Sequence, residues 1–474
     1  MDAQCEIEQL RADLAASKAR NEELEKQVLE LTKAVEELRE LLGRNSRNSN
    51  LPPSSDGPGQ GPGKSKKKGK GRKRGGQPGH RGSHRWLLPP EKVDEFVNLF
   101  PSECTNCWRP LPEDKDPQAK RYQYTELERF CPHTTEYRRN AVVCPHCGHK
   151  TMATYDEDKI PRFAFGPRLM SVVAMLTGVY HLSRRQTVSL LWELLGLRIS
   201  LGTVSNIEKR VSEAVKPAVD EAWSSAMMAR VKHFDGTSWL QAGVMLSLWT
   251  IATGAVTVFK IVANSRKETL RKLFTRLRGV LVSDRATALG FWSMSRRQIC
   301  WCHLIRKFVA FSERDGPASA IGNELLDYAA IVFAYWSDFK QGKLSRKQLQ
   351  SLMAPVRLQV EAVLQRAVDA DIDRLSGSCT DILKHRLALW TFVDTQGVEP
   401  TNNHAELELR DFVLWRKRSF GTQSQRGNLY AERLMTVART ARKQNINVLR
   451  FLSACCRADG HDVPSILSPN VGCA

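Results

Sequence analysis

Apolar residues recur every seven positions through the first 43 residues of the chain. One series runs through Ile7, Leu14, Asn21, Val28, Val35 and Leu42, and the alternating series through Leu10, Ser17, Leu24, Leu31 and Leu38. This heptad pattern predicts a coiled-coil helix over residues 1–43. Valine in the first series, leucine in the second and the single Asn21 favour a parallel homodimer. The alternative is an amphipathic helix that packs on its own chain.

The apolar spacing becomes helical between residues 156 and 226. The stretches RRQTVSLLWELLG and SLGTVSNIEKRVSEAV, with Gly196 at the turn between them, are typical of a helix-turn-helix. We expect the second helix to begin near Ser200 and to expose Thr203, Ser205 and Asn206. Such a helix either contacts DNA or only packs within the fold.

A strand pattern replaces the helical one after residue 229. Three apolar runs, RVKHFDGTSWL, GVMLSLWTIA and AVTVFKIVA, are separated by short polar turns and predict an antiparallel meander. A helical stretch over residues 267–277 follows, and then the strands GVLVSDRATAL and RRQIC. This order predicts a multidomain α/β protein whose core is an RNase H-like mixed sheet, with its first and fourth strands side by side.

Charge is unevenly distributed around a net value of +20. Residues 1–43 hold six basic and eleven acidic residues, whereas residues 44–86 hold twelve basic residues and one acidic residue. Residues 44–85 are rich in Asn, Ser, Pro and Gly and predict a disordered linker. Its basic run favours nucleic acid over a membrane as the partner. We expect phosphate contacts from Lys66, Lys67, Lys68, Arg72, Lys73 and Arg74.

Hydropathy predicts a soluble intracellular protein. The longest apolar stretch, residues 244–262, is interrupted at Thr253-Gly254, and a β-hairpin explains it better than a membrane span. The first 43 residues are polar and do not resemble a signal peptide. Twelve cysteines in 474 residues do not indicate a disulfide scaffold.

Two CxxC pairs predict a structural zinc ribbon over residues 86–155. The pairs are Cys104 with Cys107 and Cys144 with Cys147, and Gly148 suits the tight turn after the second pair. Four thiolates satisfy tetrahedral Zn²⁺ and leave no open position for catalysis. His133, His146 and His149 are alternative ligands, although surface histidines are the simpler interpretation, and Cys131 has no partner at ligand spacing.

Three acids form the candidate catalytic site. Asp235 and Asp284 lie on the first and fourth predicted strands, which are neighbours, so their carboxylates repel each other unless a cation lies between them. Glu406 follows Asn402-Asn403, a good helix cap, and supplies the third carboxylate that two divalent ions need for phosphodiester chemistry. A strand-end aspartate alone is more often a cap or an ion pair.

Several stretches of the sequence resemble those of a known protein family. The stretches NSRNSNLPPSSD, GGQPGHRG, CWCHLIRKF and TNNHAELELRDFVLWRKRSF, together with both CxxC pairs, resemble the insertion-sequence-66 family of transposases. The likeness extends from about residue 1 to residue 445. It implies that Asp235, Asp284 and Glu406 are the catalytic acids of a DDE core. Two positions depart from the family pattern: Gly236 stands where a glutamate is usual, and Leu407 where an arginine is usual.

The resemblance implies a bacterial, cytoplasmic and nucleoid-associated DNA transposase. It would cut the ends of its insertion sequence and join them to target DNA by two-metal phosphoryl transfer with Mg²⁺ or Mn²⁺, with companion proteins of the same element as candidate partners. Two alternatives are a catalytically inactive zinc-ribbon DNA-binding protein and a plain RNase H-like nuclease. Glu408 is turned away from Glu406, so the variant Glu408→Gln is expected to stay active. His303 is interpreted as a packed or capping histidine. In the folded region, DNA contacts are expected from Arg306, Lys307, Arg410, Arg416 and Lys417.

The predicted organisation has six parts. They are a coiled-coil helix over residues 1–43, a basic linker over 44–85, a zinc ribbon over 86–155, a helical DNA-binding region over 156–226, a catalytic core over 227–445 with a helical insertion at about 311–384, and a C-terminal tail over 446–474.

Overall fold

The computed structural model describes residues 2–49, 87–125, 132–154, 163–274, 276–458 and 462–467. The basic linker residues Lys66, Lys67, Lys68, Arg72, Lys73 and Arg74 therefore lie outside the described residues. By contact density the chain divides into one unit that holds residues 1–62, 136–193 and 197–474, and a second that holds residues 63–135 and 194–196. None of the described helices is both long and apolar enough to cross a membrane.

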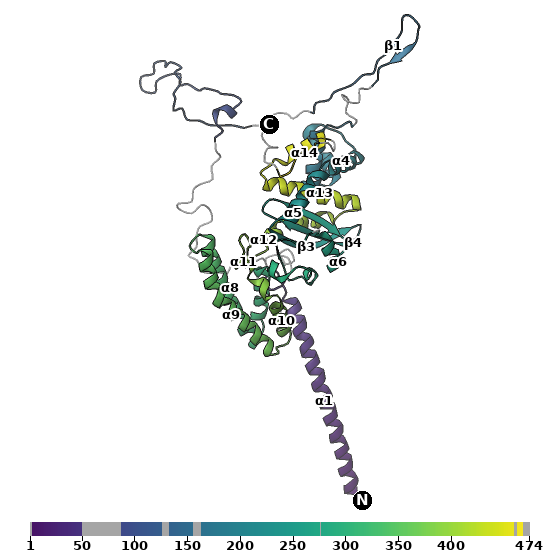
Figure 1. Ribbon diagram of the computed structural model, residues 1–474, viewed down its shortest axis with the longest axis vertical. Coiled ribbons are helices and arrows are strands. Elements are labelled where there is room, and N and C mark those ends of the chain that lie inside the picture. The colour runs from purple at the N-terminus through teal and green to yellow at the C-terminus, as the bar shows by residue number, and fades with distance from the viewer. Residues whose placement is uncertain are drawn as a thin grey trace. The chain divides into compact units, whose positions relative to one another are not determined.

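The N-terminal segment is one long helix, α1 (Asp2–Leu42) (Figure 1). Several of its predicted heptad side chains are solvent-exposed, including Leu24 at 49%, Leu31 at 65% and Leu38 at 58%. Leucines that face water along one helix are what a coiled-coil partner would cover. Within this single chain the described heptad positions therefore leave an apolar stripe uncovered.

Three short elements lie near the cysteine pairs. In the smaller unit, η2 (Pro90–Lys92) precedes the Cys104 turn. In the larger unit, β1 (Ala141–Val143) and β2 (Lys150–Met152) pair antiparallel on either side of the Cys144 turn.

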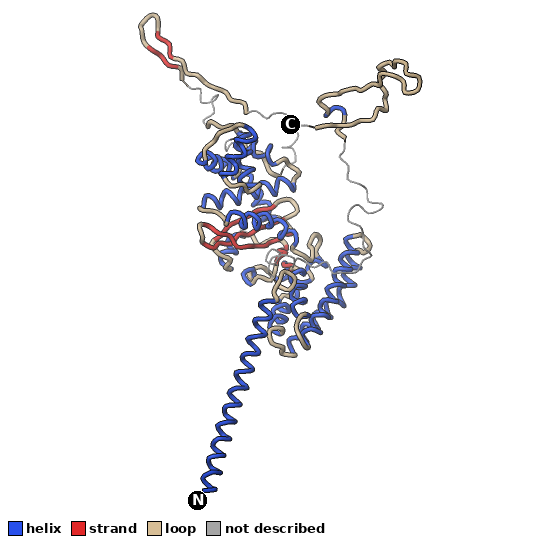
Figure 2. Tube along the Cα trace, turned by 180° about the vertical axis from the view of Figure 1, so that it is seen from behind, coloured by secondary structure: helices blue, strands red, loops and turns tan. Residues whose placement is uncertain are grey.

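A five-stranded mixed sheet forms the centre of the larger unit (Figure 2). Its strands are β3 (Val231–Gln241), β4 (Val244–Ala252), β5 (Thr257–Val262), β6 (Val280–Ser283) and β7 (Arg297–Ile299). Their order is β5-β4-β3-β6-β7, with the first three antiparallel and β3, β6 and β7 parallel. The first and fourth strands of the sheet are neighbours, as predicted. The arrangement is compatible with an RNase H-like core.

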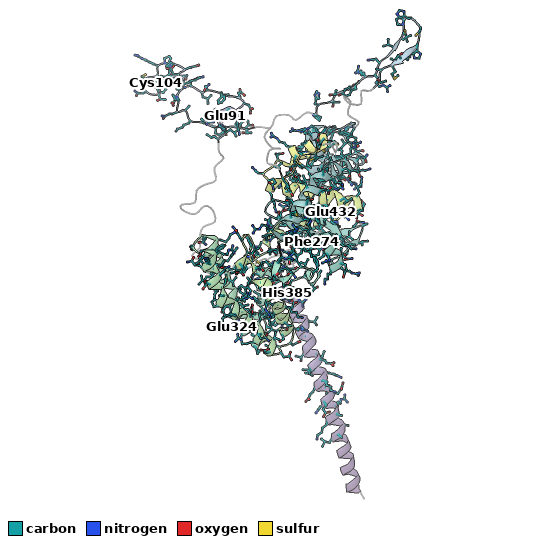
Figure 3. The ribbon with its side chains drawn as sticks, in the orientation of Figure 1. Glu91, Cys104, Phe274, Glu324, His385 and Glu432 are labelled. Atoms are coloured by element: carbon teal, nitrogen blue, oxygen red, sulfur yellow. The ribbon has the colours of Figure 1, made fainter. Side chains whose placement is uncertain are left out.

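Each face of the sheet has its own apolar cover. Trp239 lies on the same side of β3 as Asp235 and packs against Phe412 of α12 (Asn403–Ser419), with ring centroids 5.4 Å apart. On the opposite side, Phe234 stacks on Trp249 at 4.7 Å and contacts Phe274, which is labelled in Figure 3, at 5.2 Å. Alternation along β3 thus directs Asp235 toward the face that α12 covers.

The free edge of the sheet is covered by α13 (Gln425–Lys443). The backbone N–H groups of β5 donate hydrogen bonds to Thr440 Oγ1 at 3.2 Å, to Thr436 Oγ1 at 3.2 Å and to the carboxylate of Glu432 at 2.7 Å. Burial raises the pKa of that glutamic acid, while Lys260 opposes the rise. Polar side chains of α13 therefore accept hydrogen bonds from backbone N–H groups that would otherwise be unpaired at this strand edge.

The helical region before the sheet packs against the core. Its elements are α2 (Pro167–Ala174), η3 (Met175–Val179), α3 (Arg184–Leu195), α4 (Leu201–Ala214) and α5 (Lys216–Met228). Ser200 caps α4 through Thr203 N, and Gly196 has the positive φ of 62° expected of the turn. Asn206 is exposed, whereas Ser205 accepts hydrogen bonds from Arg426 of α13. The predicted recognition helix is thus also a packing helix.

The helical insertion begins after α7 (Trp301–Ser312) and is dominated by α8 (Pro317–Lys340) and α9 (Arg346–Asp369), which lie side by side (Figure 1). Then follow α10 (Ser376–Lys384), η6 (Arg386–Leu389) and α11 (Thr391–Asp394). Between β5 and β7 lie α6 (Lys267–Leu273), η4 (Thr287–Leu289) and η5 (Met294–Arg296).

The segment expected to be a C-terminal tail contains a folded helix. Residues 448–458 form α14 (Val448–Ala458), whose Phe451, Leu452 and Cys455 are fully buried. The helix packs against α2 and α13. The tail prediction is corrected for these residues, because an amphipathic helix of this length buries too much apolar surface to stay unpacked.

Candidate active site

Two of the three predicted acids lie side by side just past the parallel ladder of β3 and β6, with Asp235 in the middle of β3 and Asp284 directly after β6. The ladder between β3 and β6 ends at the pair His233–Val282, and extending this register by two residues on each strand places Asp235 next to Asp284. Neighbouring strands are about 4.8 Å apart, so the two carboxyl groups share one small space.

Glu406 reaches the same space from the first turn of α12. Asn402, fully buried before that turn, donates from Nδ2 to Phe234 O at 2.9 Å, and its backbone N–H contacts Cys300 Sγ at 3.1 Å. The side chain of Asn402 does not cap the helix, contrary to the prediction. It instead ties the start of α12 to β3 one residue before Asp235.

The electrostatics of Asp235 show that the acids act on one another. The pKa of Asp235 is raised to about 7, mainly by burial and in addition by the charges of Asp284 and Glu406, while the backbone N–H of Gly236 and the charge of Arg306 oppose the rise. Asp235 Oδ1 accepts that N–H at 2.9 Å. Crowded carboxylates that repel one another form a natural site for a divalent cation.

The oxygen donors therefore fit Mg²⁺ or Mn²⁺. Glu406 Oε1 is buried and has no hydrogen-bond partner among the described residues, so an acceptor is left unused beside the aspartates. Carboxylate oxygens are the ligands that hard cations prefer. The residues that could hold such an ion are Asp235, Asp284 and Glu406.

Helix α7 places further polar groups against this carboxylate cluster. His303 Nδ1 lies 3.9 Å from Glu406 Oε1 and likewise has no hydrogen-bond partner among the described residues. The donor atoms of Cys300, His303 and Glu406 lie within 4.8 Å of one another, so this trio could also hold a metal ion. Sequence reasoning treated His303 as a packed or capping histidine. Its spacing, three residues after Cys300 and three before Arg306, could have placed it on one helix face with them.

Arg297 supports the Asp284 end of the cluster and was not anticipated. Its side chain is fully buried in β7 and donates from Nη2 to Asp284 O at 3.0 Å and to Ser283 Oγ at 3.3 Å. Burial lowers the pKa of its guanidinium, and the charge of Asp284 opposes that effect. The next loop residue, Arg285, pairs with Asp381 of α10 at 2.6 Å and links the Asp284 loop to the insertion.

The predicted DNA-contacting residues occupy different environments. Arg306 and Lys307 are half-buried on α7, and Arg306 is close enough to influence the charge of Asp235. Arg410 and Lys417 are exposed on α12. Arg416 is half-buried and donates to Thr237 Oγ1 at 3.2 Å, so it ties α12 to β3.

The two departures from the family pattern do not touch the carboxylate cluster. Gly236 lies opposite Trp249 in the β3–β4 register, and a Cβ there would come within 2.5 Å of the indole ring. The tryptophan therefore excludes a glutamate, on the sheet face away from Asp235. Leu407 is 60% exposed.

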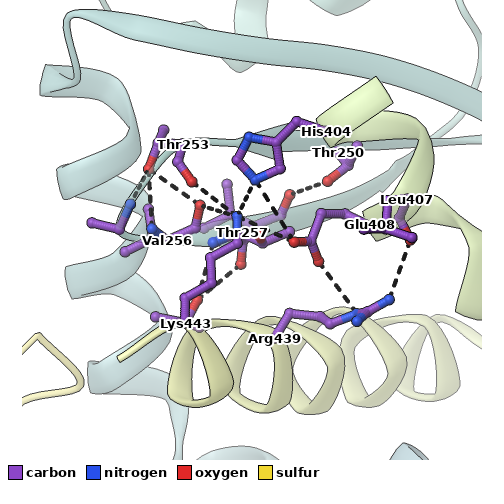
Figure 4. Close-up of polar contacts among 12 residues, drawn as sticks. Thr250, Thr253, Val256, Thr257, His404, Leu407, Glu408, Arg439 and Lys443 are labelled. Carbon is purple, nitrogen blue, oxygen red and sulfur yellow. Dashed lines mark hydrogen bonds and ion pairs between the residues drawn. The ribbon is translucent and has the colours of Figure 1, made fainter. Parts of the chain in front are cut away.

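Glu408 has a structural role that the sequence did not reveal. It is 6% exposed and pairs with Lys443 Nζ at 3.2 Å and Arg439 Nε at 3.3 Å (Figure 4). Lys443 also donates to Thr253 O at 2.9 Å and contacts His404 Nε2 at 2.8 Å. This buried ion network joins α12, α13 and the β4–β5 turn, so Glu408 contributes to the fold. That the variant Glu408→Gln stays active remains a prediction.

Each cysteine pair forms a tight turn of its own. Around Cys104, Trp108 N donates to Cys104 O at 2.8 Å, and around Cys144, Gly148 N donates to Cys144 O at 2.9 Å. Backbone N–H groups of Asn106 and Cys107 lower the pKa of Cys104, and those of Cys147 and His146 lower that of Cys144. Turns that stabilise thiolates in this way are suited to soft metal ions.

Comparison with known proteins places the chain in a family. Residues 162–429, which include the sheet and all three acids, match the model of the IS66 family of transposases. Residues 1–86 match a second model, described only as a family of unknown function. Among curated proteins, none gives a significant match. Because the first model spans more than half of the chain, this protein belongs to the IS66 family of transposases.

Proposed function

We propose that the chain is an active DNA transposase that cuts the ends of its insertion sequence and joins them to target DNA. The observation that carries this proposal is the convergence of Asp235, Asp284 and Glu406 just past the end of the parallel ladder between β3 and β6, within a family of transposases. Neither departure from the family pattern removes an acid, which favours an active enzyme over an inactive DNA-binding derivative.

The three carboxylates would hold divalent cations. When bound, Mg²⁺ supplies Lewis acidity that makes a water or a 3′-hydroxyl a stronger nucleophile and neutralises charge on the leaving oxygen. The chain's own residues position the reactants. Arg306 lies on the face of α7 directed at the acids and would contact a DNA phosphate, while Arg297 and Asn402 fix the strand and helix ends that carry the acids.

The raised pKa of Asp235 predicts a pH-dependent affinity for Mg²⁺. In the metal-free chain this carboxyl titrates near 7 instead of 3.8, so below about pH 7 the cation must displace a proton. Calorimetric titration should show the affinity rising up to tenfold per pH unit from about pH 6 to about pH 7, then levelling off. Asp235→Asn should abolish this dependence. Equal affinities at about pH 6 and pH 8 in the native chain would rule out Asp235 as a ligand.

The unliganded chain should respond to pH in the opposite direction. The folded carboxyl keeps its proton up to about pH 7, whereas the unfolded one ionises near 3.8, so this group's contribution to folding stability declines as pH rises between those values. Mg²⁺ should reverse the decline by binding only the folded, ionised site.

The two cysteine pairs would hold one structural zinc ion. Purified protein should contain about one zinc per chain, and both Cys104→Ser and Cys144→Ser should lose it, because three thiolates leave the tetrahedral site incomplete. Cys131→Ser is the matched control and should keep its zinc. Elemental analysis is the measurement, and unchanged zinc in both pair variants would refute the site.

The remaining assignments complete the proposal. Exposed leucines of α1 would pair two chains through residues 1–43, and the basic linker would contact DNA phosphates without sequence preference. A plain nuclease would cut DNA and not join it. The function is therefore tested by an assay that detects both products from DNA flanking the gene.

A further inference from the structure

Three arginines line an open pocket at the amino ends of the parallel strands. Arg230 directly precedes β3, Arg278 lies two residues before β6, and Arg296 directly precedes β7. Because these strands are parallel, the pocket lies at the opposite end of the β3–β6 ladder from Asp235 and Asp284. Its volume is about 350 Å³, and none of the described residues that line it is acidic.

The backbone holds these side chains at a fixed spacing. Arg230 O accepts from Val280 N at 2.8 Å, which joins the starts of β3 and β6. Gly279 has a φ of 75°, and a Cβ there would come within 2.5 Å of Arg230 O, so the two segments are in direct contact. The bases of the Arg230 and Arg278 side chains therefore cannot separate without disrupting the sheet.

The backbone carbonyl groups around the pocket already accept hydrogen bonds. Lys232, whose side chain is buried, donates from Nζ to Ala229 O at 2.5 Å and to Arg278 O at 2.8 Å. Arg296 donates from Nη1 to Leu277 O at 3.1 Å. Among the described residues, no carboxylate forms an ion pair with Arg230, Arg278 or Arg296, and all three are exposed. Their positive charge is thus available to an anion from solvent.

We propose that Arg230, Arg278 and Arg296, the arginine pocket, bind backbone phosphates of duplex DNA. Planar guanidinium groups match phosphate oxygens in pairs, and three of them without a competing acid provide a strong anion site. That the anion belongs to DNA rests on the proposed function. The arginine pocket thus provides a phosphate-binding site separate from the carboxylate cluster. It would hold a second stretch of DNA.

Arginine-specific chemical modification tests the proposal directly. The full chain is treated with a phenylglyoxal reagent with and without a duplex DNA, and the modified residues are identified by mass spectrometry. DNA should slow modification of the three pocket arginines at least several-fold, while Arg271, exposed on α6 outside the pocket, serves as the control. Equal reactivity of the three arginines with and without DNA would overturn the proposal.

Binding measurements supply a second test that does not depend on reactivity. The slope of log affinity against log salt is negative, and each lost phosphate contact makes it shallower by about 0.9. Changing all three arginines to glutamine should therefore reduce its magnitude by about 2 to 3. Arg271→Gln should leave it within about one unit, and unfolding curves should show that both variants fold. A slope in the triple variant equal to that of the control would reject the pocket.

These results also separate this inference from the proposed function. A wild-type chain that binds and cleaves DNA while its pocket arginines stay unprotected would refute the pocket alone. A chain that binds DNA with protected pocket arginines but never cleaves it would refute the enzyme and keep the pocket.

Discussion

Replacing Asp235 or Asp284 with asparagine, or Glu406 with glutamine, is expected to reduce DNA strand cleavage by several orders of magnitude. Each change keeps the shape of the side chain and removes a charge that holds the cations, and a bound divalent ion contributes several kcal/mol to phosphoryl transfer. DNA binding should stay within a few-fold of wild type, because basic residues outside the cluster contact the phosphates. Cleavage of a labelled end substrate measures the first effect and fluorescence anisotropy the second.

Matched variants separate a catalytic loss from misfolding. Asp338→Asn, on the exposed part of α8, and Glu399→Gln, in an exposed pair with Lys340, should cleave normally. Asp235→Asn should also unfold at a higher temperature than the metal-free wild type at about pH 8, because it removes a buried charge that its neighbours repel. Normal cleavage by all three acid variants would disprove the proposed chemistry. If only Glu406→Gln stayed active, Glu406 would not be the third ligand.

Glu408→Gln should produce the opposite result, a loss of stability with catalysis retained. The substitution removes the buried counter-charge of Lys443 and Arg439, whose side chains are 15% and 18% exposed, and leaves Arg439 with the 30% exposed Asp411 at 3.1 Å. Breaking such a buried pair costs roughly 3 kcal/mol or more. Thermal or denaturant unfolding of the full chain should register the change, and cleavage below the melting temperature should stay within about tenfold of wild type, since Glu408 faces α13 and not the acids.

The exposed pair of Lys340 and Glu399 calibrates that loss. The two side chains are 2.9 Å apart and 56% and 44% exposed, so Glu399→Gln should change the free energy of unfolding by less than about 1 kcal/mol. If Glu408→Gln is no less stable than Glu399→Gln, the buried network does not contribute to the fold as described.

The sheet and the neighbouring aspartates could be predicted because they depend on local patterns. Alternating apolar runs predicted the strands, and the closeness of Asp235 and Asp284 followed from the expected pairing of the first and fourth strands. The turn at Gly196 and the helix cap at Ser200 could likewise be predicted from the local sequence. Each of these features is determined by residues close together in sequence or by a simple pairing rule.

The partners of the acids could not be predicted, because they come from distant segments. Glu408 lies 31 and 35 residues from Arg439 and Lys443, and its burial depends on how α13 covers the sheet edge. Arg297 resembled an ordinary surface charge, although a charged residue within an apolar strand could have indicated burial. Asn402 is a residue type that often caps helices, yet its side chain donates a hydrogen bond to β3 because that strand approaches the start of the helix.

The DNA products that the wild-type chain forms test the transposase function most directly. Purified protein, Mg²⁺ and a labelled duplex from the boundary of its own gene should yield a nick that exposes a 3′-hydroxyl, followed by a joined product when target DNA is added. Neither product should form with Ca²⁺ in place of Mg²⁺ or with Asp284→Asn. Cleavage that continues without a divalent cation, or cutting of the boundary DNA without any joined product, would contradict a metal-dependent transposase.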